Sequence, residues 1–592
     1  MIRNWYRDTD NGAVHALGNG RMLIYAIGPE ILQIVGAPYS AESLGTLTIP
    51  SVNSCSSERL PKTAIWKHNL DNGTIMTDVV DSQLTCFIRN INAACDFTMV
   101  LQTNEAFLCR EKGDIFSFHS PNGNSFFTYK TSLIVHHSIT ATGNASIEEI
   151  SDHIYEIHIR KGESSLIFAN DPAVIRQIEE TTFDAVLKRT SDYWYSFVNR
   201  GKKVPSALSE LCENIAILIK CQQGEDGGIL AGYPFHLAYI RDQYGTVRGL
   251  LKMGFIQEAE AVMLYYLNIW KKYGSLHTAQ SVGKQGIFHI HENENVEITG
   301  YLAIMPFDVY RYNGNRDFIE ELLPMVRWAL DCQAGELKNG ILPFNGDETY
   351  IAGRFLPRAA MYDGSAEATM LFAEGIRRYQ DFTMDMRYSS YLKEITDTYL
   401  HHFCSDGHYV TNNPFRLPVD EYPPTRHGVC EDCNAILTTL YKTATNRYVC
   451  SKCLDHKPLP AWEPKEYELA SSKLAPIYIG STLVPDEVIQ EFLNEMVARY
   501  QKTGQMPSGC PNGECVGYDY GMLLYALTLK KHPESKTFYE LALKVVDETG
   551  AWCEYYRNGI ARSTRCRPWE SAINIEAILT YLEQNDESNN FT

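Results

Sequence analysis

Acidic residues lie beside aromatic residues in three polar segments of the chain. In the first segment, GYPFHLAYIRDQYG, the pair Arg241 and Asp242 follows His236 and Tyr239. An adjacent arginine and carboxylate can form forked hydrogen bonds with neighbouring hydroxyl groups, and aromatic rings pack against the apolar face of a sugar. We therefore predict that these four residues contact a sugar. The alternative is an aspartate at a helix start that forms a surface ion pair.

The second segment, NGILPFNGDETYIAGRF, carries Asp347 and Glu348 directly after a glycine. Cleavage of a glycosidic bond with inversion requires a carboxylic acid that protonates the leaving oxygen and a carboxylate that activates water on the opposite face. Because neighbouring carboxylates raise each other's pKa, one of this pair can stay protonated as the general acid. Glu348 is the preferred acid and Asp347 the second choice; the alternative is a solvated acidic turn.

The third segment, TGAWCEYYRNGIARSTRCRPWESAIN, carries the candidate general base. Glu554 lies close to Trp552, while Arg567, Trp569 and Glu570 open the final predicted helix. A glutamate beside aromatic rings at the edge of a pocket suits a base that activates water. Trp552, Arg567 and Trp569 are expected to contact the substrate. The alternative is ordinary packing of the aromatic rings beside an exposed glutamate.

Four of the sixteen cysteines have the spacing of a metal site. They form the pattern C-x2-C-x16-C-x2-C, with Cys430, Cys433, Cys450 and Cys453 as its members. This spacing is typical of a zinc ribbon, in which two knuckles supply four thiolates to one tetrahedral ion. A closed four-cysteine shell has no open position for water, so the zinc is expected to be structural. No organic cofactor is expected.

A further polar segment, GIFHIHENENVEITGY, combines histidines with glutamates. It lacks the H-x3-H and H-E-x-x-H spacings of zinc enzymes. Contacts with substrate, or a solvated loop, are therefore favoured over a metal site. The residues concerned are His289, His291, Glu292, Glu294 and Glu297.

These polar segments fall between predicted secondary-structure elements. Alternating and β-branched runs predict strands up to about residue 200, whereas from Pro205 onward the apolar residues recur with helical spacing. The expected helices span residues 205–223, 240–254, 256–273, 297–313, 316–333, 364–380, 385–404, 465–477, 486–502, 517–531, 535–548 and 570–584.

The lengths of the connections predict how these helices are arranged. Connections after odd-numbered helices are long, and those after even-numbered helices are only a few residues. In a ring of helical hairpins all long connections then lie on one rim, where several can converge on one pocket. The sequence thus predicts a multidomain α and β protein, with an N-terminal β-sandwich (1–200) and a C-terminal (α/α)6 barrel (205–592). The zinc-ribbon-like insertion (425–460) follows the seventh helix.

The amino-acid composition limits the kinds of molecule that the protein is expected to bind. The 592-residue chain has a formal net charge of −19, whereas binding to nucleic acid requires a basic surface. The sequence has no secretory signal and no apolar run long enough to cross a membrane, so a cytoplasmic protein without a membrane partner is expected. A neutral oligosaccharide suits this charge better than a polyanion, and a homo-oligomer remains an open alternative.

The order of three motifs resembles that of the glucoamylase-type glycoside hydrolases of the (α/α)6-barrel superfamily. The motifs are YIRDQYG, FNGDETY, and WCEYY followed by RPWESAIN, and the resemblance covers about residues 205–590. It implies that Arg241 and Asp242 bind the sugar at the non-reducing end, that Glu348 or Asp347 is the acid and that Glu554 is the base. An exo-acting, inverting enzyme for an α-glucoside-like substrate is expected. Bacterial glucoamylases and related disaccharide phosphorylases also carry an N-terminal sandwich.

Two other functions fit the same architecture. An inverting disaccharide phosphorylase replaces the base carboxylate by bound phosphate, so the presence of Glu554 favours hydrolysis. A catalytically silent carbohydrate-binding protein, with the zinc ribbon as a docking module, belongs to a different class. Product release from oligosaccharides, with and without phosphate, separates the three functions.

Overall fold

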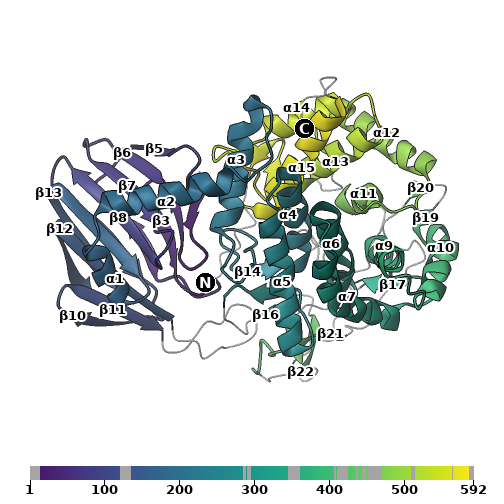
Figure 1. The fold of residues 1–592 in the computed structure, drawn as a ribbon, viewed down its shortest axis with the longest axis horizontal. Helices are drawn as coiled ribbons and strands as arrows, with labels where there is room; N and C mark the ends of the chain where they lie inside the picture. The colour runs from purple at the N-terminus through teal and green to yellow at the C-terminus, as the bar shows by residue number, and fades with distance from the viewer. Residues whose placement is uncertain are drawn as a thin grey trace.

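The computed structural model contains an N-terminal sheet and a C-terminal ring of helices (Figure 1). No described helix is long and apolar enough to cross a membrane. The structure describes residues 14–120, 135–283, 288–289, 295–344, 361–405, 408–409, 424–434, 438–442, 448–450, 453, 470–507, 514–562 and 565–585.

The N-terminal part is a single antiparallel sheet of thirteen strands whose two ends curl towards each other. Its central order is β1-β2-β3-β4-β9-β13-β8-β7-β6-β5, and β10, β11 and β12 extend it beside β13. The strands are β1 (Val14–Gly18), β2 (Leu23–Ile27), β3 (Glu30–Val35), β4 (Gly45–Thr48), β5 (Cys55–Arg59), β6 (Trp66–Leu70), β7 (Ile75–Val80), β8 (Cys86–Ala93), β9 (Phe97–Thr103), β10 (Leu108–Lys112), β11 (Ile115–Ser120), β12 (Val135–Ser151) and β13 (Ile154–Ala169).

Alternation along the strands gives this sheet two apolar faces. In β8, Phe87 and Ile91 belong to the inner core, which also contains Leu17 of β1, whereas Cys86 and Ile88 belong to a second cluster on the other face. Strand residues alternate between the two faces, so a curled sheet can bury one face against itself. The second face is covered by helices α1 (Pro172–Glu179) and α2 (Phe183–Val198).

These two helices correct the expectation of β structure throughout the first 200 residues. Asp171 caps α1 by accepting a hydrogen bond from the backbone of Ala173, and Pro172 occupies the first turn. Thr182 caps α2 in the same way, through the backbone of Ala185. Aspartate or threonine caps and an early proline are helix-start signals, and here they were outweighed by the strand pattern upstream.

All twelve predicted helices of the C-terminal part are present in the described residues. Their observed bounds are α3 (Ser206–Cys221), α4 (Ile240–Met253), α5 (Ile256–Tyr273), α6 (Glu297–Asn313), α7 (Arg316–Glu336), α9 (Ala366–Thr383), α10 (Ser389–Phe403), α11 (Ala470–Ile479), α12 (Asp486–Thr503), α13 (Tyr518–Leu529), α14 (Ser535–Lys544) and α15 (Pro568–Asn585).

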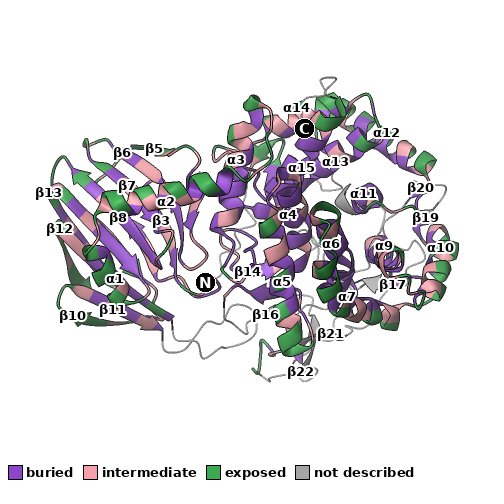
Figure 2. Ribbon diagram, viewed as in Figure 1, coloured by how far each residue is buried: buried purple, intermediate pink, exposed green. Residues whose placement is uncertain are grey.

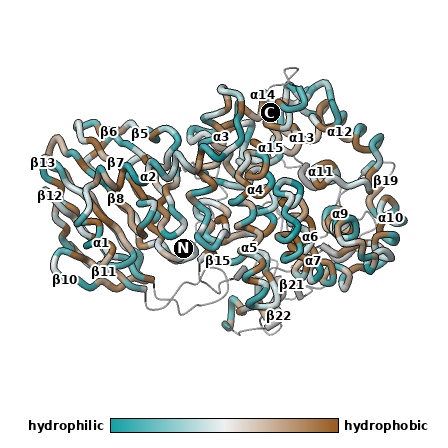
Figure 3. The backbone as a smooth tube through the Cα atoms, in the orientation of Figure 1, coloured by the Kyte–Doolittle hydropathy of each residue, from teal (hydrophilic) through white to brown (hydrophobic). Residues whose placement is uncertain are grey.

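Six of these helices form a closed inner ring. Helix α4 packs on α6, α6 on α9, α9 on α11, α11 on α13, α13 on α15, and α15 on α4 again. Figure 2 shows that inner helices such as α4, α6 and α15 are mostly buried, while outer helices such as α10 and α12 expose one face. In Figure 3 the hydrophobic stretches run through the interior of both parts of the chain. This double ring is the predicted (α/α)6 barrel.

The inner helices approach each other closely because glycines line their contacts. A Cβ on Gly249 of α4 would lie 2.6 Å from Cβ of Ala572 in α15, and one on Gly300 of α6 would lie 2.7 Å from Cβ of Leu371 in α9. Both distances are shorter than real side chains allow, so larger residues would push the ring apart.

Short strands occur in the connections that lead from an outer helix to the next inner helix. Two of their small sheets join different connections, since β14 pairs with β15 and β24 pairs with β25. The long connections therefore come together on one rim. These strands are β14 (Leu237–Tyr239), β15 (Ala279–Ser281), β16 (Phe288–His289), β17 (Leu342–Phe344), β18 (Met361–Ser365), β19 (Cys404–Ser405), β20 (His408–Tyr409), β21 (Pro424–Gly428), β22 (Thr438–Lys442), β23 (Tyr448–Cys450), β24 (Glu514–Val516), β25 (Tyr555–Arg557) and β26 (Ile560–Ala561).

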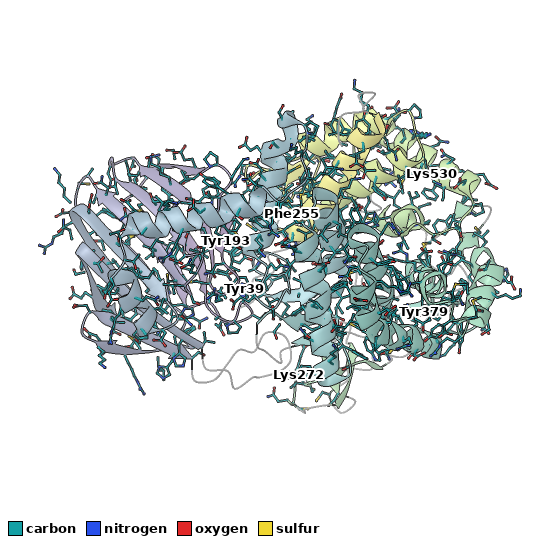
Figure 4. The ribbon with its side chains drawn as sticks, viewed as in Figure 1. Tyr39, Tyr193, Phe255, Lys272, Tyr379 and Lys530 are labelled. Atoms are coloured by element: carbon teal, nitrogen blue, oxygen red, sulfur yellow. The ribbon has the colours of Figure 1, made fainter. Side chains whose placement is uncertain are left out.

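The sheet and the barrel share one continuous core. Tyr39 lies between them, together with Tyr193 and Phe255 (Figure 4). Its hydroxyl donates to the backbone oxygen of Cys221, at 2.8 Å, and accepts from the backbone nitrogen of Gly20, at 2.7 Å. Buried hydrogen bonds of this kind fix the sheet against the first barrel helix.

The barrel end opposite the long connections is closed by a buried ion pair beside a cavity of about 200 Å³. Arg248 donates from Nε and Nη2 to Oε1 of Glu576, at 3.0 and 2.7 Å, and its guanidinium lies 3.7 Å from the ring centre of Tyr478. The Tyr478 hydroxyl donates to the second carboxylate oxygen of Glu576, at 3.1 Å.

We expect Glu576→Ala to lower the free energy of unfolding by about 3–5 kcal/mol, because it leaves the Arg248 guanidinium buried without its counter-charge. Urea unfolding followed by tryptophan fluorescence measures the change. Glu583→Ala, on the same helix, is the matched control, since Glu583 is exposed and forms surface pairs with Lys202 and Lys252, which should contribute at most about 1 kcal/mol. Equal losses in the two variants would contradict the prediction.

Candidate active site

Six charged residues gather on the rim of the barrel where the long connections meet. Arg241 and Asp242 stand in the first turn of α4, Glu297 begins α6, and Glu570 lies in the first turn of α15. Glu554 precedes β25, and Arg567 directly precedes α15. We call this set, Arg241, Asp242, Glu297, Glu554, Arg567 and Glu570, the rim cluster.

Arg567 connects three carboxylates of the rim cluster. Its Nε and Nη2 donate to Oε2 and Oε1 of Glu570, at 3.1 and 3.2 Å. Nη2 also lies 3.7 Å from Oδ2 of Asp242 and 3.8 Å from Oε1 of Glu554. The predicted base and the predicted sugar-binding aspartate therefore flank the same guanidinium nitrogen, although more than 300 residues separate them in the sequence.

The position of Glu554 is fixed by contacts between its backbone and the connection before α13. Its carbonyl oxygen accepts a hydrogen bond from the backbone nitrogen of Gly517, at 2.8 Å. A Cβ at position 517 would lie 2.0 Å from the carbonyl oxygen of Cys553, so only glycine permits this approach. The pairing of β24 with β25 continues the contact. The connection before α13 thus fixes the position of the candidate base.

Arg241 forms the other side of the rim cluster. Its Nη1 donates to Oε1 of Glu297 at 2.7 Å, and its Nη2 lies 3.8 Å from Oδ1 of Asp242. The guanidinium lies 5.1 Å from the ring centre of Trp569, within cation–π range. The Trp569 ring also packs on Tyr518, with ring centres 4.4 Å apart. Asp242 therefore lies between the guanidinium groups of Arg241 and Arg567, and the Trp569 ring packs against Arg241.

Burial and crowding raise the pKa of two carboxyl groups in the rim cluster. Burial is the largest cause for Asp242, whose pKa rises to about 6; Arg241 and Arg567 lower it, and Glu554 and Glu297 raise it further. Burial also raises the pKa of Glu570 to about 7, against the lowering effect of Arg567. Four carboxyl groups face only two guanidiniums here, and this excess of acid favours the protonated forms of Asp242 and Glu570.

Solved structures of glycoside hydrolases share the fold of this chain. A bacterial glucoamylase complexed with acarbose matches with a TM-score of 0.66 at 10% sequence identity, over 96% of this chain and 94% of that chain. The chain has the glucoamylase-type fold. A family GH92 α-mannosidase from Bacteroides thetaiotaomicron matches with a TM-score of 0.52 at 10% identity, over 95% and 81% of the two chains. No protein-family model matches the sequence, and no curated protein is significantly similar to it.

The glucoamylase-type fold confirms the predicted combination of an N-terminal β-sandwich and an (α/α)6 barrel. Of the predicted site residues, Arg241, Asp242, Glu554, Arg567 and Trp569 are brought together on its rim. Tyr239 also lies nearby, as the residue directly before α4, in edge contact with Phe235 at 6.4 Å between ring centres.

Two predicted substrate contacts lie away from the rim cluster. His236 is buried against the N-terminal sheet, where its Nε2 lies 2.9 Å from Oε1 of Gln33, and burial lowers its pKa to about 4. Trp552 has no exposed surface, and its indole nitrogen donates to the backbone oxygen of Ala542 at 3.1 Å. Both side chains serve packing between elements in this structure.

The candidate acids Asp347 and Glu348 lie outside the described residues, as do His291, Glu292 and Glu294. Their positions relative to Glu554 stay predictions. The four predicted zinc ligands are described, and they form a separate cluster in the connection between α10 and α11.

Glu570 belongs to the rim cluster but was not among the predicted site residues, whereas Glu297 was predicted as a substrate contact or as part of a solvated loop. A regular signal points to them, because five of the six inner helices carry an acid in their first turn. Free backbone N–H groups at a helix N-terminus favour negative charge, and the inner helices all begin on the same rim. The five acids are Asp242, Glu297, Glu367, Asp519 and Glu570.

Asp519, another of these first-turn acids, allows the raised pKa of a buried carboxyl group to be tested. Burial raises its pKa from the ordinary 3.8 to about 7, so the folded state holds its proton more tightly than the unfolded chain does. The stability contribution of the neutral carboxyl is therefore present below about pH 4 and lost as the pH rises through about 7.

Asp519→Asn keeps the acceptor for the backbone nitrogen of Val516, which lies 3.1 Å away, but removes the charge. We expect its effect on the free energy of unfolding to become more favourable by about 2–3 kcal/mol between pH 5 and pH 8. Urea unfolding of both proteins at the two pH values measures this difference. A mutational effect that is the same at both pH values would contradict the raised pKa.

Proposed function

We propose that the protein is an inverting glycoside hydrolase that acts on the non-reducing end of an oligosaccharide. The observation that carries the proposal is the convergence of Asp242 and Glu554 on one nitrogen of Arg567, on the rim of a glucoamylase-type barrel. A base carboxylate next to a carboxylate that binds the sugar would stand close enough to activate a water molecule at the bound sugar.

In this mechanism Glu554 is the general base. It removes a proton from a water molecule, whose oxygen then attacks the anomeric carbon from the face opposite the leaving group. Glu348, or Asp347 in its place, donates a proton to the leaving oxygen as the glycosidic bond breaks. Inversion requires room for the water, so the acid and base carboxyl groups are expected to lie about 6.5–9.5 Å apart.

Arg241 and Asp242 hold the terminal sugar in the mechanism. Asp242 can accept hydrogen bonds from two hydroxyl groups, and Arg241 can donate to their oxygens. Trp569 orients Arg241 through the cation–π contact described above. An α-glucoside-like substrate is proposed, in keeping with the acarbose bound to the glucoamylase.

The charge of the rim cluster favours water over phosphate as the nucleophile. A phosphorylase must bind a phosphate dianion beside the sugar, and cationic groups normally provide that binding. Here the two guanidiniums of Arg241 and Arg567 are already engaged by carboxylates. Binding a dianion beside Glu554 would place like charges together in a buried site.

The test is a panel of α- and β-linked disaccharides and oligosaccharides, incubated with the full chain in the presence and absence of inorganic phosphate. Proton NMR during the first minutes identifies the anomer released. A free sugar whose anomeric configuration is opposite to that of the substrate supports the proposal. A sugar phosphate formed only with phosphate, a retained anomer, or sugar binding without any product would overturn it.

A further inference from the structure

We propose that Cys430, Cys433, Cys450 and Cys453 bind one structural zinc ion, and that this ion holds together the segment from β21 to Cys453. Each cysteine offers one sulfur, and all four sulfurs lie within 4.8 Å of one another. The inference rests on this segment alone and is independent of the proposed activity. Neither the rim cluster nor the structural relatives supply any part of it.

The distances between the sulfurs fit a tetrahedral metal site. Sγ of Cys433 lies 3.6 Å from Sγ of Cys450, which lies 3.8 Å from Sγ of Cys453. Four sulfurs at about 2.3 Å from a central zinc ion are about 3.8 Å from one another. A disulfide would bring two sulfurs to about 2.05 Å, and none of the four cysteines forms one. The cluster therefore has the size of a four-thiolate shell.

The backbone around the cluster supports sulfur ligands in the thiolate form. The backbone nitrogen of Cys450 donates to Sγ of Cys430 at 3.2 Å, so the two halves of the pattern are linked through a ligand atom. Each half turns tightly, because the backbone nitrogen of Asn434 donates to the oxygen of Cys430 and that of Cys453 donates to the oxygen of Cys450, both at 2.9 Å. Backbone N–H groups directed at a ligating sulfur orient and stabilise it.

The described side chains of the segment form one small buried cluster, which is centred on the cysteines. Its three strands, β21, β22 and β23, form a small antiparallel sheet (Figure 1). Its only cluster of buried residues in the described part contains Cys430, Val449 and Cys450, with Tyr448 and Cys453 packed against them. A sheet of this size cannot bury enough apolar surface to fold without a metal or a cross-link. One ion bound by the four cysteines would cross-link such a small sheet.

The ligand set selects the type of metal and its role. Four sulfur ligands in a tetrahedron favour zinc or iron and exclude magnesium and calcium, which require oxygen ligands. Four protein ligands complete the coordination of zinc, so no position remains for a water molecule or a substrate. The site is therefore structural.

The experiment measures metal in the full chain, purified without chelators, by inductively coupled plasma mass spectrometry. We expect about one zinc ion per chain, and an at least tenfold lower content in Cys433→Ser. Cys95→Ser is the matched control, because Cys95, like Cys433, is exposed and forms no disulfide but lies outside the cluster. It should retain the zinc content of the wild type.

A second measurement does not depend on the folding of a variant. Titration of the wild-type chain with a mercurial reagent should release the zinc, and limited proteolysis should then cut between residues 424 and 453 before it cuts the barrel. Fewer than one zinc ion per ten chains, iron in place of zinc, disulfides in the unreduced intact mass, or full zinc content in Cys433→Ser would each overturn the assignment.

Discussion

Glu554→Gln is expected to lower kcat for hydrolysis by about 10²–10⁴-fold, the usual contribution of a general base. Glutamine has the same shape but cannot take a proton from water. Glu554 is 2% exposed, and its contact with Arg567 fixes its carboxylate beside Asp242. KM should change much less than kcat, because the residue acts on water and not on the ground-state sugar. Initial rates on the best substrate of the panel give both constants.

Two further variants serve as a control and a rescue experiment for the Glu554→Gln measurement. Glu540→Gln, on the exposed face of α14, removes a similar charge from a surface pair with Lys536 and should leave kcat unchanged. Glu554→Ala creates space near the attacked carbon, so added azide should partly restore turnover and yield a glycosyl azide of inverted configuration. A Glu554→Gln protein that folds normally and hydrolyses at the wild-type rate would remove the proposed base.

The helical part of the fold could be predicted because its signals are local. Apolar residues recur every three or four positions, and left-handed glycines such as Gly254 and Gly314 end α4 and α6 directly before the next helix starts. The sheet is different. Its central strands pair as β4 with β9, β9 with β13 and β13 with β8, and these pairings depend on long-range contacts that strand patterns do not encode.

The residues of the candidate site could likewise be predicted only in part from local sequence signals. Arg241, Asp242 and Glu554 could be selected because they lie beside aromatic residues in or directly after long connections, where binding and catalytic residues are concentrated. Trp552 met the same criterion, yet its ring lies in the core between α14 and α15, since a sequence does not show to which side of a connection a ring is directed. Glu570 follows a helix start and resembles an ordinary first-turn acid, and only the tertiary structure places it against Arg567.

Asp242→Asn is expected to lower kcat/KM by about 10²–10³-fold, because hydrogen bonds that sugar hydroxyls donate to an ionised carboxylate are about twice as strong as those to a neutral amide. Asparagine keeps one acceptor for a sugar hydroxyl but loses the charge that Arg241 and Arg567 bracket. Because burial raises the pKa of Asp242 to about 6, wild-type kcat/KM should fall as the pH drops below about 6, and the Asn variant should lose that part of the pH profile.

Asp242→Asn should lower activity without lowering the stability of the fold. This combination separates a functional role of Asp242 from a merely structural one. A buried carboxyl with a raised pKa stabilises the fold when neutral, and this contribution is lost as the pH rises through about 6. Above that pH the neutral asparagine avoids the burial of a charge, so the variant should melt at the same temperature as the wild type or higher at pH 7.5. Unchanged kcat/KM, or a loss of activity that parallels a lower melting temperature, would show that Asp242 supports the fold and does not hold the sugar.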